Sequence, residues 1–283
     1  MNGIIIIDKE LGLSSHDVVS RLRRILKTRR VGHAGTLDPM ASGVLVVMIN
    51  KATKLSNYLV MDSKQYIATF KLGVSTTTQD LEGEIVSKKE YKNDISLERL
   101  DEVLKSFEGK ITQIPSIYSA IKVNGKKLYE YARNNEEVEI PSREITINKI
   151  QLLEFSDDEI SIKVDCSSGT YIRTLCYDIS KELGYPGVLT KLRRTQSGQF
   201  NINDAFTLEQ VEKNDFKMLS INEGLQDYDK LEVNEQEAKD VLNGKPIITN
   251  KEKDFIIVDK DKEVLALYGA SVDGISKMKR GLW

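Results

Sequence analysis

The sequence predicts an α+β fold with a central mixed, largely antiparallel sheet and a small C-terminal module. Segments with the apolar pattern of strands recur along the chain, and segments with helical spacing lie between them. The composition then changes near Asp227. A chain of 283 residues is long enough for one large domain or two. We therefore expect a large domain followed by a small one.

The predicted strands are uniformly apolar or alternate, and turn residues bound them. They span Ile4–Ile7, Val44–Ile49, Gln65–Leu72, Ile145–Leu153, Ile160–Cys166 and part of Leu189–Phe200. Apolar residues at helical spacing predict helices over Val18–Leu26, Leu97–Phe107 and Thr174–Leu183. The run from Thr207 to Gln210 matches a capping box, which marks the start of another helix.

Two regions depart from this pattern. Residues 119–144, approximately, combine the tight-turn pair Asn124–Gly125 with lysines, an arginine and tyrosines, which indicates a basic, aromatic insertion. Residues 228–283 contain a predicted helix over Asn234–Asn243 and a predicted hairpin that joins Phe255–Val258 to Val264–Tyr268. We therefore divide the chain into a domain over 1–225, which carries the insertion, and a small domain over 228–283.

The composition excludes several classes of protein. The hydrophobic fraction of 40% and the charged fraction of 30% are ordinary for a globular protein. A net charge of −2 excludes a surface coated in positive charge, so any nucleic-acid site must be a local basic patch. The two cysteines and two histidines are scattered, and we expect no metal site. The apolar run Ile4–Ile7 is too short for a signal sequence or a membrane span, which favours a cytoplasmic location.

The segment Gly32–Pro39 is the strongest candidate for a functional loop. Its two glycines permit backbone conformations that other residues avoid, and Pro39 favours an extended conformation at Asp38. Asp38 could act in chemistry, or it could cap its own turn as an aspartate before proline often does. His33 could be a base, a stacking group or a buried hydrogen-bonded residue. No Gly-Lys-Ser/Thr follows, so the pattern is not that of a phosphate-binding loop.

Basic residues gather near this loop and again further along the chain. The cations within residues 21–30 have no acid among them, and they could bind phosphates or form a solvated helix face. Arg173 could hold a carboxylate ionised or could be a surface arginine. Arg193 and Arg194 follow Leu192 at the end of a predicted strand. Tyr66 falls on an alternating strand, where core packing is the default.

Taken in order, these motifs resemble one family. Gly-His-Ala-Gly-Thr-Leu-Asp-Pro followed by Ser-Gly-Val-Leu resembles the signature of the bacterial tRNA pseudouridine-55 synthases, the TruB family of pseudouridine synthases. Further motifs agree in the same order: Asp8-Lys9 with Gly12 and Ser15, Tyr66 after a lysine, Tyr118-Ser119-Ala120 before Gly125 to Tyr129, Gly169 to Leu175, and Leu192-Arg193-Arg194. The resemblance covers about residues 1–225, and the shared order argues against chance agreement.

The resemblance implies three catalytic residues. Asp38 resembles the nucleophilic aspartate of the family, Tyr66 the tyrosine that stacks on the target base, and Arg173 the arginine that pairs with the aspartate. Because forming pseudouridine adds no atom and transfers no electron, no cofactor is expected.

Other matching positions imply contacts with RNA. Tyr171 and Leu192 resemble the lining of the base pocket, His33 resembles the histidine that enters the RNA loop, and Lys9 is expected to support the loop at the site. The residues expected to bind RNA phosphates are Arg21, Arg24, Lys126, Lys127, Arg193 and Arg194.

Three positions depart from the family pattern: Glu10 replaces a usual proline, Ala34 a common threonine and Thr77 a frequent aspartate. They bear on loop stiffness and RNA affinity more than on the type of reaction. Residues 228–283 resemble the small RNA-binding PUA module of the family, through weak motifs.

The implied function is isomerisation of uridine 55 in the T-loop of tRNA, with the base flipped out of its stack. The implied partner is the tRNA T-arm, with no membrane partner, and we expect a monomer. One alternative is a non-catalytic RNA-binding protein or tRNA-folding chaperone. A hydrolase with an aspartate nucleophile is a second alternative, which the lack of an obvious second carboxylate beside Asp38 disfavours.

Overall fold

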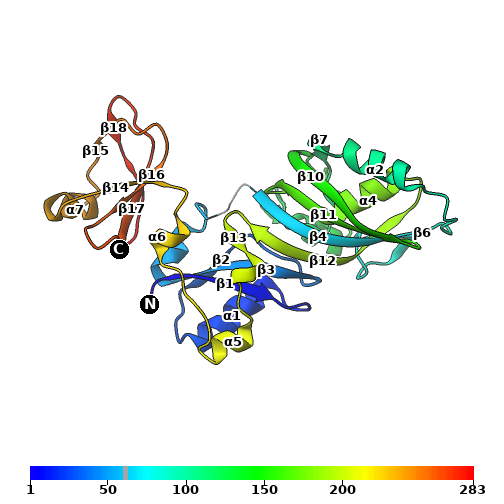
Figure 1. Ribbon diagram of the computed structural model, residues 1–283, viewed down its shortest axis with the longest axis horizontal. Helices are drawn as coiled ribbons and strands as arrows, with labels where there is room; N and C mark the ends of the chain where they lie inside the picture. The colour runs from blue at the N-terminus through cyan, green and yellow to red at the C-terminus, as the bar shows by residue number, and fades with distance from the viewer. Residues whose placement is uncertain (60–62) are drawn as a thin grey trace. The chain divides into compact units, whose positions relative to one another are not determined.

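The computed structural model describes residues 1–59 and 63–283, which fold into two compact units (Figure 1). The first unit combines Met1–Pro39, Gly43–Val60 and Phe200–Trp283, and the second combines Met40–Ser42 with Met61–Gln199. Each unit therefore joins segments that are distant in sequence. The division of the chain into 1–225 and 228–283 stays a prediction.

An antiparallel sheet forms the centre of the first unit. Its strands are β1 (Gly3–Lys9), β2 (Val31–Ala34) and β3 (Ala41–Ile49), and both β1 and β2 pair with β3. The isoleucines of β1 are almost fully buried, as expected of a strand covered on both faces. Helices α1 (Ser15–Ile25) and α5 (Leu208–Glu212) pack on one face through a shared apolar cluster. The short elements completing this part are η1 (Asn50–Leu55), β13 (Phe200–Asn201), η2 (Ile202–Asp204) and α6 (Ile221–Gly224).

Local sequence signals explain where these helices begin. The side chain of Ser14 accepts a hydrogen bond from the backbone of Asp17, and the Asp17 side chain accepts one from the backbone of Ser14. This reciprocal capping box satisfies two backbone donors at the start of α1. Thr207 and Gln210 form the same arrangement at α5, which confirms the predicted capping box.

The C-terminal part of the first unit has a sheet of its own. The order is β14 (Asp229–Glu232), β16 (Phe255–Val258), β17 (Val264–Tyr268) and β19 (Met278–Gly281), with β14 and β16 parallel. Helix α7 (Glu235–Leu242) packs against it, and β15 (Ile247–Ile248) pairs with β18 (Ile275–Ser276). The predicted helix and the predicted hairpin are therefore confirmed.

The second unit is built on a five-stranded antiparallel run. Its order is β12 (Gly187–Ser197), β4 (Ser63–Leu72), β11 (Glu159–Ser167), β10 (Arg143–Ser156) and β7 (Gly109–Gln113). Helices α2 (Leu97–Ser106) and α4 (Ile172–Glu182) contact each other, and they pack on β10 and on β12 and β4, respectively (Figure 1). Alternate residues of β4 from Tyr66 to Leu72 are buried, whereas most of those between them are partly exposed. The helices therefore cover the face of the sheet on which Tyr66 lies.

Two excursions leave this sheet. One is the hairpin of β5 (Val74–Thr76) and β6 (Ile85–Lys88). The other contains the hairpin of β8 (Lys122–Val123) and β9 (Lys126–Lys127), followed by α3 (Leu128–Arg133). Asn124 and Gly125 have φ angles of 51° and 82°, the left-handed conformations that a tight hairpin turn of this kind requires. The predicted tight turn is confirmed.

Two local expectations were wrong. Gly32 and His33 were predicted on a loop, but they lie in β2, because Val31–Ala34 pairs with the edge of β3. Arg193 and Arg194 were predicted at the end of a strand, but β12 continues to Ser197 through its pairing with β4.

Candidate active site

Asp38 lies on the loop that joins β2 to β3 in the first unit. The loop begins at Gly35, whose φ angle of 77° lies in the left-handed region that favours glycine. Leu37 is buried, Pro39 is exposed, and Asp38 between them is partly exposed. The loop therefore buries the residue that precedes Asp38 and leaves Asp38 itself partly exposed.

Ser15 holds the residue that precedes Asp38. Its Oγ donates to the carbonyl oxygen of Leu37 at 3.0 Å and accepts from the amide of Leu37 at 2.9 Å. Ser15 is itself buried at the start of α1. One hydroxyl therefore satisfies both backbone groups of a buried residue, which would be costly to leave unpaired.

Lys9 and Gly12 hold the residue that follows Asp38. The amide of Gly12 donates to the carbonyl oxygen of Pro39 at 2.9 Å. The Nζ of Lys9, a fully buried side chain, donates to the carbonyl oxygen of Leu13 at 2.6 Å and lies 3.5 Å from that of Pro39. Lys9 thus has the geometry of a loop support, and the backbone is fixed on both sides of Asp38.

The proposed RNA-binding residues of the first unit lie on β2 and α1. His33 is partly exposed on β2. Arg21 and Arg24 are exposed on α1, where they line a surface depression of about 490 Å³. Three carboxylates line the same depression, those of Glu10, Glu209 and Glu212. A phosphate that bound there would therefore compete with carboxylates for the two arginines.

Tyr66 and Leu192 lie on one face of the second unit's sheet. In the pairing of β4 with β12, Tyr66 is opposite Arg194 and Leu192 is opposite Ala68. Opposite residues of an antiparallel pair project to the same face, and so do residues two apart on one strand. Tyr66 and Leu192 are 7% and 8% exposed, so each is mostly covered. The sheet thus brings these two predicted pocket residues to neighbouring positions.

Arg194 does not have the exposure that phosphate binding needs. Its side chain is 0% exposed, and it lies beside Tyr66 in the sheet. A fully buried guanidinium cannot reach an RNA phosphate at the surface, so burial argues against the contact expected of it. Arg193 points to the opposite face, is partly exposed, and donates from Nη1 to the Oγ of Ser42 at 3.3 Å.

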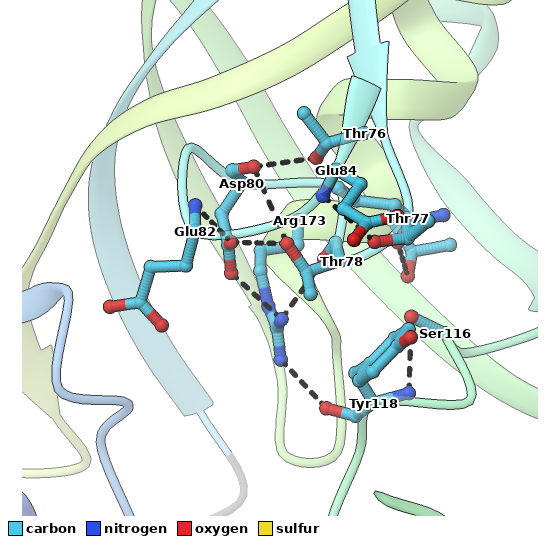
Figure 2. A network of polar contacts seen from close by, with 11 residues as sticks. Thr76, Thr77, Thr78, Asp80, Glu82, Glu84, Ser116, Tyr118 and Arg173 are labelled. Carbon is cyan, nitrogen blue, oxygen red and sulfur yellow. Dashed lines mark hydrogen bonds and ion pairs between the residues drawn. The ribbon is translucent and has the colours of Figure 1, made fainter. Parts of the chain in front are cut away.

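Arg173 lies in the first turn of α4, inside a dense polar network (Figure 2). Its Nη1 donates to Oδ2 of Asp80 at 2.9 Å and to the carbonyl oxygen of Thr78 at 3.0 Å. Its Nη2 donates to the carbonyl oxygen of Tyr118 at 3.2 Å. The side chains of Arg173 and Asp80 are 10% and 4% exposed. A buried ion pair of this kind is kept in place by several directed bonds.

Asp80, the buried partner of Arg173, was missed by sequence reasoning. Its Oδ1 accepts from the amide of Glu82 at 3.0 Å and from the hydroxyl of Thr78, so each carboxylate oxygen has a partner (Figure 2). The signal for Asp80 in the sequence was the polar segment Thr77–Asp80 followed by Gly83, which indicates a turn. Thr77 in this segment is one of the three positions that depart from the family pattern. Asp38 and Arg173 belong to different units, and their pairing stays a prediction.

Residues 23–172 match the family described as TruB family pseudouridylate synthase (N terminal domain), and residues 173–228 match the tRNA pseudouridylate synthase B C-terminal domain. The chain belongs to the TruB family. It is therefore a pseudouridine synthase, an isomerase.

Curated TruB relatives match the chain over almost its whole length. A tRNA pseudouridine synthase B of Staphylococcus saprophyticus is 44% identical over 98% of this chain and 97% of its own. One of Staphylococcus aureus is 45% identical over 94% of each chain. One of Corynebacterium diphtheriae is 45% identical over 86% of this chain and 84% of its own.

Solved structures share the fold of this TruB chain. A chain of a Cbf5-Nop10-Gar1 complex aligns with a TM-score of 0.76 at 23% identity, over 99% of this chain and 85% of that one. A chain of an H/ACA RNP bound to a substrate RNA containing 2'-deoxyuridine aligns with a TM-score of 0.75, also at 23% identity and with the same shares. The predicted fold class is confirmed.

Two lysines predicted to bind phosphate lie on the β8–β9 hairpin of the TruB chain, and both have internal partners. Lys126 forms a 2.6 Å ion pair with Glu136 and lies over the ring of Tyr131. The Nζ of Lys127 donates to the hydroxyl of Tyr129 at 3.1 Å, which raises the pKa of Lys127. RNA phosphates that bound here would have to displace or join these partners.

Among residues 1–59 and 63–283, no group of three or more histidine, cysteine, aspartate or glutamate residues could hold a metal ion. Over the same residues, no helix combines the length and the apolar character needed to cross a membrane.

Proposed function

We propose that this TruB chain converts uridine 55 in the T-loop of tRNA into pseudouridine, with Asp38 as nucleophile. Two findings support the substrate class: family membership, and relatives named tRNA pseudouridine synthase B. The observation that carries the assignment of Asp38 is the loop around it, in which Leu37 and Pro39 are both fixed by bonds from the β1–α1 segment. Preorganised placement of a reacting group is a large part of enzymatic rate enhancement.

The proposed reaction exchanges one bond of the base for another. The bond from ribose C1′ to N1 of uracil breaks, and a bond from C1′ to C5 forms. The proton on C5 leaves to water and N1 gains one, so atoms and electrons balance without a cofactor. A carboxylate that bonds covalently to the nucleoside divides this into two easier steps. Attack on the base and attack on C1′ both begin from an ionised Asp38.

Arg173 is proposed to act beside Asp38 as a fixed positive charge. A neighbouring guanidinium favours the ionised form of a carboxylate. Arg173 is suited to this task because Asp80, Thr78 and Tyr118 fix its position. An arginine held this way need not reorganise during the reaction.

The target base is proposed to leave its stack and enter a pocket that includes Tyr66, Leu192 and Tyr171. The ring of Tyr66 offers a stacking surface, and its neighbour Leu192 on the same sheet face offers an apolar one. Flipping a base costs a few kcal/mol, and stacking in the pocket offsets part of this. His33, partly exposed on β2, would occupy the space left in the RNA loop.

The proposed RNA-binding surface takes in several exposed or partly exposed cations and the C-terminal sheet of residues 228–283. The cations are Arg21, Arg24, Lys126, Lys127 and Arg193. RNA of this type is recognised through its shape and its splayed bases, with phosphate contacts fixing the register. We propose that a single copy of the chain binds the T-arm.

The test uses an unmodified tRNA transcript that carries tritium at C5 of its uracils. Wild type, Asp38→Ala and Asp38→Asn are incubated with it, and tritium released to water is counted. Asp101→Asn, a change on the exposed face of α2, is the matched control. We expect about one equivalent of tritium per tRNA from wild type and from the control, and none from the Asp38 variants.

A second transcript, with the T-loop uridine replaced by cytidine, tests the position. Release that continues from this transcript would contradict the assignment to uridine 55. No release from wild type, despite tight and salt-sensitive binding, would favour the RNA-binding protein or chaperone. Free uracil among the products would indicate a hydrolase instead.

A further inference from the structure

The segment that joins β7 to β10 starts and ends beside two residues that are paired across the sheet. Gln113 is the last residue of β7, Arg143 is the first of β10, and the two lie opposite each other in the antiparallel register. Residues 114–142, with the lysine-bearing β8–β9 hairpin and α3, run between them. The base of this segment is therefore a fixed point in the sheet.

Gln113 binds the backbone of Tyr171 twice. Its Nε2 donates to the carbonyl oxygen of Tyr171 at 3.0 Å, and its Oε1 accepts from the amide of Tyr171 at 2.9 Å. Gln113 is 1% exposed, so both bonds form away from solvent. A buried side-chain amide that lost them would leave polar groups to be desolvated without compensation. One side chain thus fixes both backbone polar groups of the residue that precedes α4.

Three further contacts join this segment and its base to the residues around the start of α4. Nη1 of Arg143 donates to the carbonyl oxygen of Gly169 at 3.1 Å, and its guanidinium lies 5.6 Å from the centre of the Tyr171 ring. Tyr118, within the segment, accepts from Arg173 through its carbonyl oxygen. The start of α4 is therefore held from the base of the segment and from within it.

We propose that Gln113 is a positioning residue for the isomerisation: it sets the ring of Tyr171 and the first turn of α4, and so Arg173, relative to the bound base. It also joins the lysine-bearing segment to these residues, so that RNA bound on the segment and the base in the pocket share one rigid support. This inference rests on the roles proposed for Tyr171 and Arg173. A displacement of about 1 Å at a reacting centre can cost about 100-fold in rate.

The experiment measures single-turnover tritium release at saturating enzyme, together with RNA binding and melting temperature. Gln113→Met keeps the volume of the side chain and removes both bonds to Tyr171. We expect its rate constant to fall about 10-fold to 100-fold while the Kd for tRNA stays within about threefold of wild type. Gln151→Met, an exposed change on β10, is the matched control and should leave the rate constant unchanged.

Gln113→Glu separates positioning from folding. An ionised glutamate still accepts from the Tyr171 amide but repels the Tyr171 carbonyl oxygen, whereas a protonated glutamate can donate to that oxygen as Nε2 does. We expect the rate constant of this variant, divided by that of wild type at the same pH, to rise as the pH falls from 8 to 5.5.

Three outcomes would overturn the proposal. They are a wild-type rate constant in both Gln113 variants, a loss of rate in Gln113→Glu that is independent of pH, and a loss explained wholly by weaker tRNA binding. Asp38→Ala in the same assay keeps the two hypotheses apart. If that variant releases tritium as wild type does, the proposed function fails, whatever the Gln113 variants show.

Discussion

The loop that carries Asp38 and the side chain of Arg173 are both held by hydrogen bonds, but the partners differ in kind and in distance along the chain. The bonds that fix the Asp38 loop come from Ser15, 22 residues away from Leu37, and from Lys9, 30 residues from Pro39. The bonds that fix Arg173 come from residues 93 and 55 positions away, Asp80 and Tyr118. The first support is built from a contiguous part of the sequence, and the second from three separate parts of it.

The two supports also differ in electrostatics. Around Asp38 the bonds reach neutral backbone groups of Leu37 and Pro39. Around Arg173 the principal partner is a buried carboxylate. Loss of a neutral hydrogen bond costs about 1–3 kcal/mol when a buried group is left unsatisfied, whereas loss of one member of a buried ion pair costs about 3–5 kcal/mol. A substitution that breaks the Arg173 ion pair should therefore lower the free energy of unfolding more than one that breaks a bond to the Asp38 loop.

Among substitutions in the two supports, Asp80→Asn is expected to lower the free energy of unfolding most. The variant keeps the shape of the side chain and removes the charge that compensates Arg173, so the free energy of unfolding should fall by about 3 kcal/mol or more. The single-turnover rate of tritium release should fall with it. Denaturant melts measure the first quantity, and Asp101→Asn, which breaks only the surface pair with Lys105, is the control. A wild-type melt for Asp80→Asn would show that the buried pair does not support α4.

Ser15→Ala tests the support of the Asp38 loop. Both bonds to the backbone of Leu37 are lost, so we expect about 1–3 kcal/mol of destabilisation and a rate of tritium release reduced about tenfold or more. The neighbouring Ser14→Ala removes the N-cap of α1 at a cost of about 1 kcal/mol but makes no bond to the loop. Equal rates in the two variants would contradict a role for Ser15 in placing Asp38.

Helix α4, which carries Arg173, also carries the partly buried carboxyl of Asp178. Its titration makes the stability of this helix depend on pH. Burial raises the pKa of Asp178 to about 6, and the nearby Lys181 lowers it by less. The folded protein thus binds this proton more tightly than the unfolded chain does, so stability from this group is full below about pH 4 and is lost as the pH rises to 6. Asp178→Asn should raise the free energy of unfolding by about 1 kcal/mol at pH 8, after allowance for solvent screening, and by nothing near pH 4. A difference that does not change with pH would contradict this explanation.

The smallest expected effect is a change in the Kd for tRNA caused by Glu136→Gln. Glu136 pairs with Lys126 on the segment proposed to bind RNA, and the hydrogen bond from Lys126, with that from Asn134, lowers the pKa of the glutamate. Removing the charge frees Lys126 for a phosphate, so the Kd for tRNA should tighten about twofold to fivefold at low salt and less at high salt. Glu182→Gln, which breaks a surface pair with Arg99, should leave the Kd unchanged. Filter binding at two salt concentrations distinguishes the two.

Much of the local structure could be predicted because its causes are local. The buried strand β1, the capping box at α5 and the Asn124–Gly125 turn each depend on residues close together in sequence. The Asp38 loop could be predicted only in part, since Gly32 and His33 lie in β2. The bonds from Lys9, Gly12 and Ser15 to the backbone of Leu37 and Pro39 give a physical explanation for these three motif residues.

The other features depend on contacts between distant segments, which local patterns specify poorly. Asp80 forms an ion pair with Arg173, which is 93 positions away in the sequence. Gln113 bonds to the backbone of Tyr171, which is 58 positions away. Arg194 looked like a surface cation because charged residues are usually exposed, but its place opposite Tyr66 in the sheet buries it. The contacts of Gln113 and Arg194 follow from the register of β7 with β10 and of β4 with β12, which hydrophobic periodicity does not specify.

The most direct test of Asp38 as nucleophile is position-resolved detection of pseudouridine in a T-arm tRNA transcript after a single turnover with wild type and with Asp38→Asn. The isosteric change keeps the loop bonds of Leu37 and Pro39 and removes the nucleophile. We predict complete conversion at uridine 55 by wild type and a rate at least about 10³-fold lower for the variant, with unchanged tRNA binding. Conversion by Asp38→Asn at the wild-type rate would contradict the assignment of Asp38.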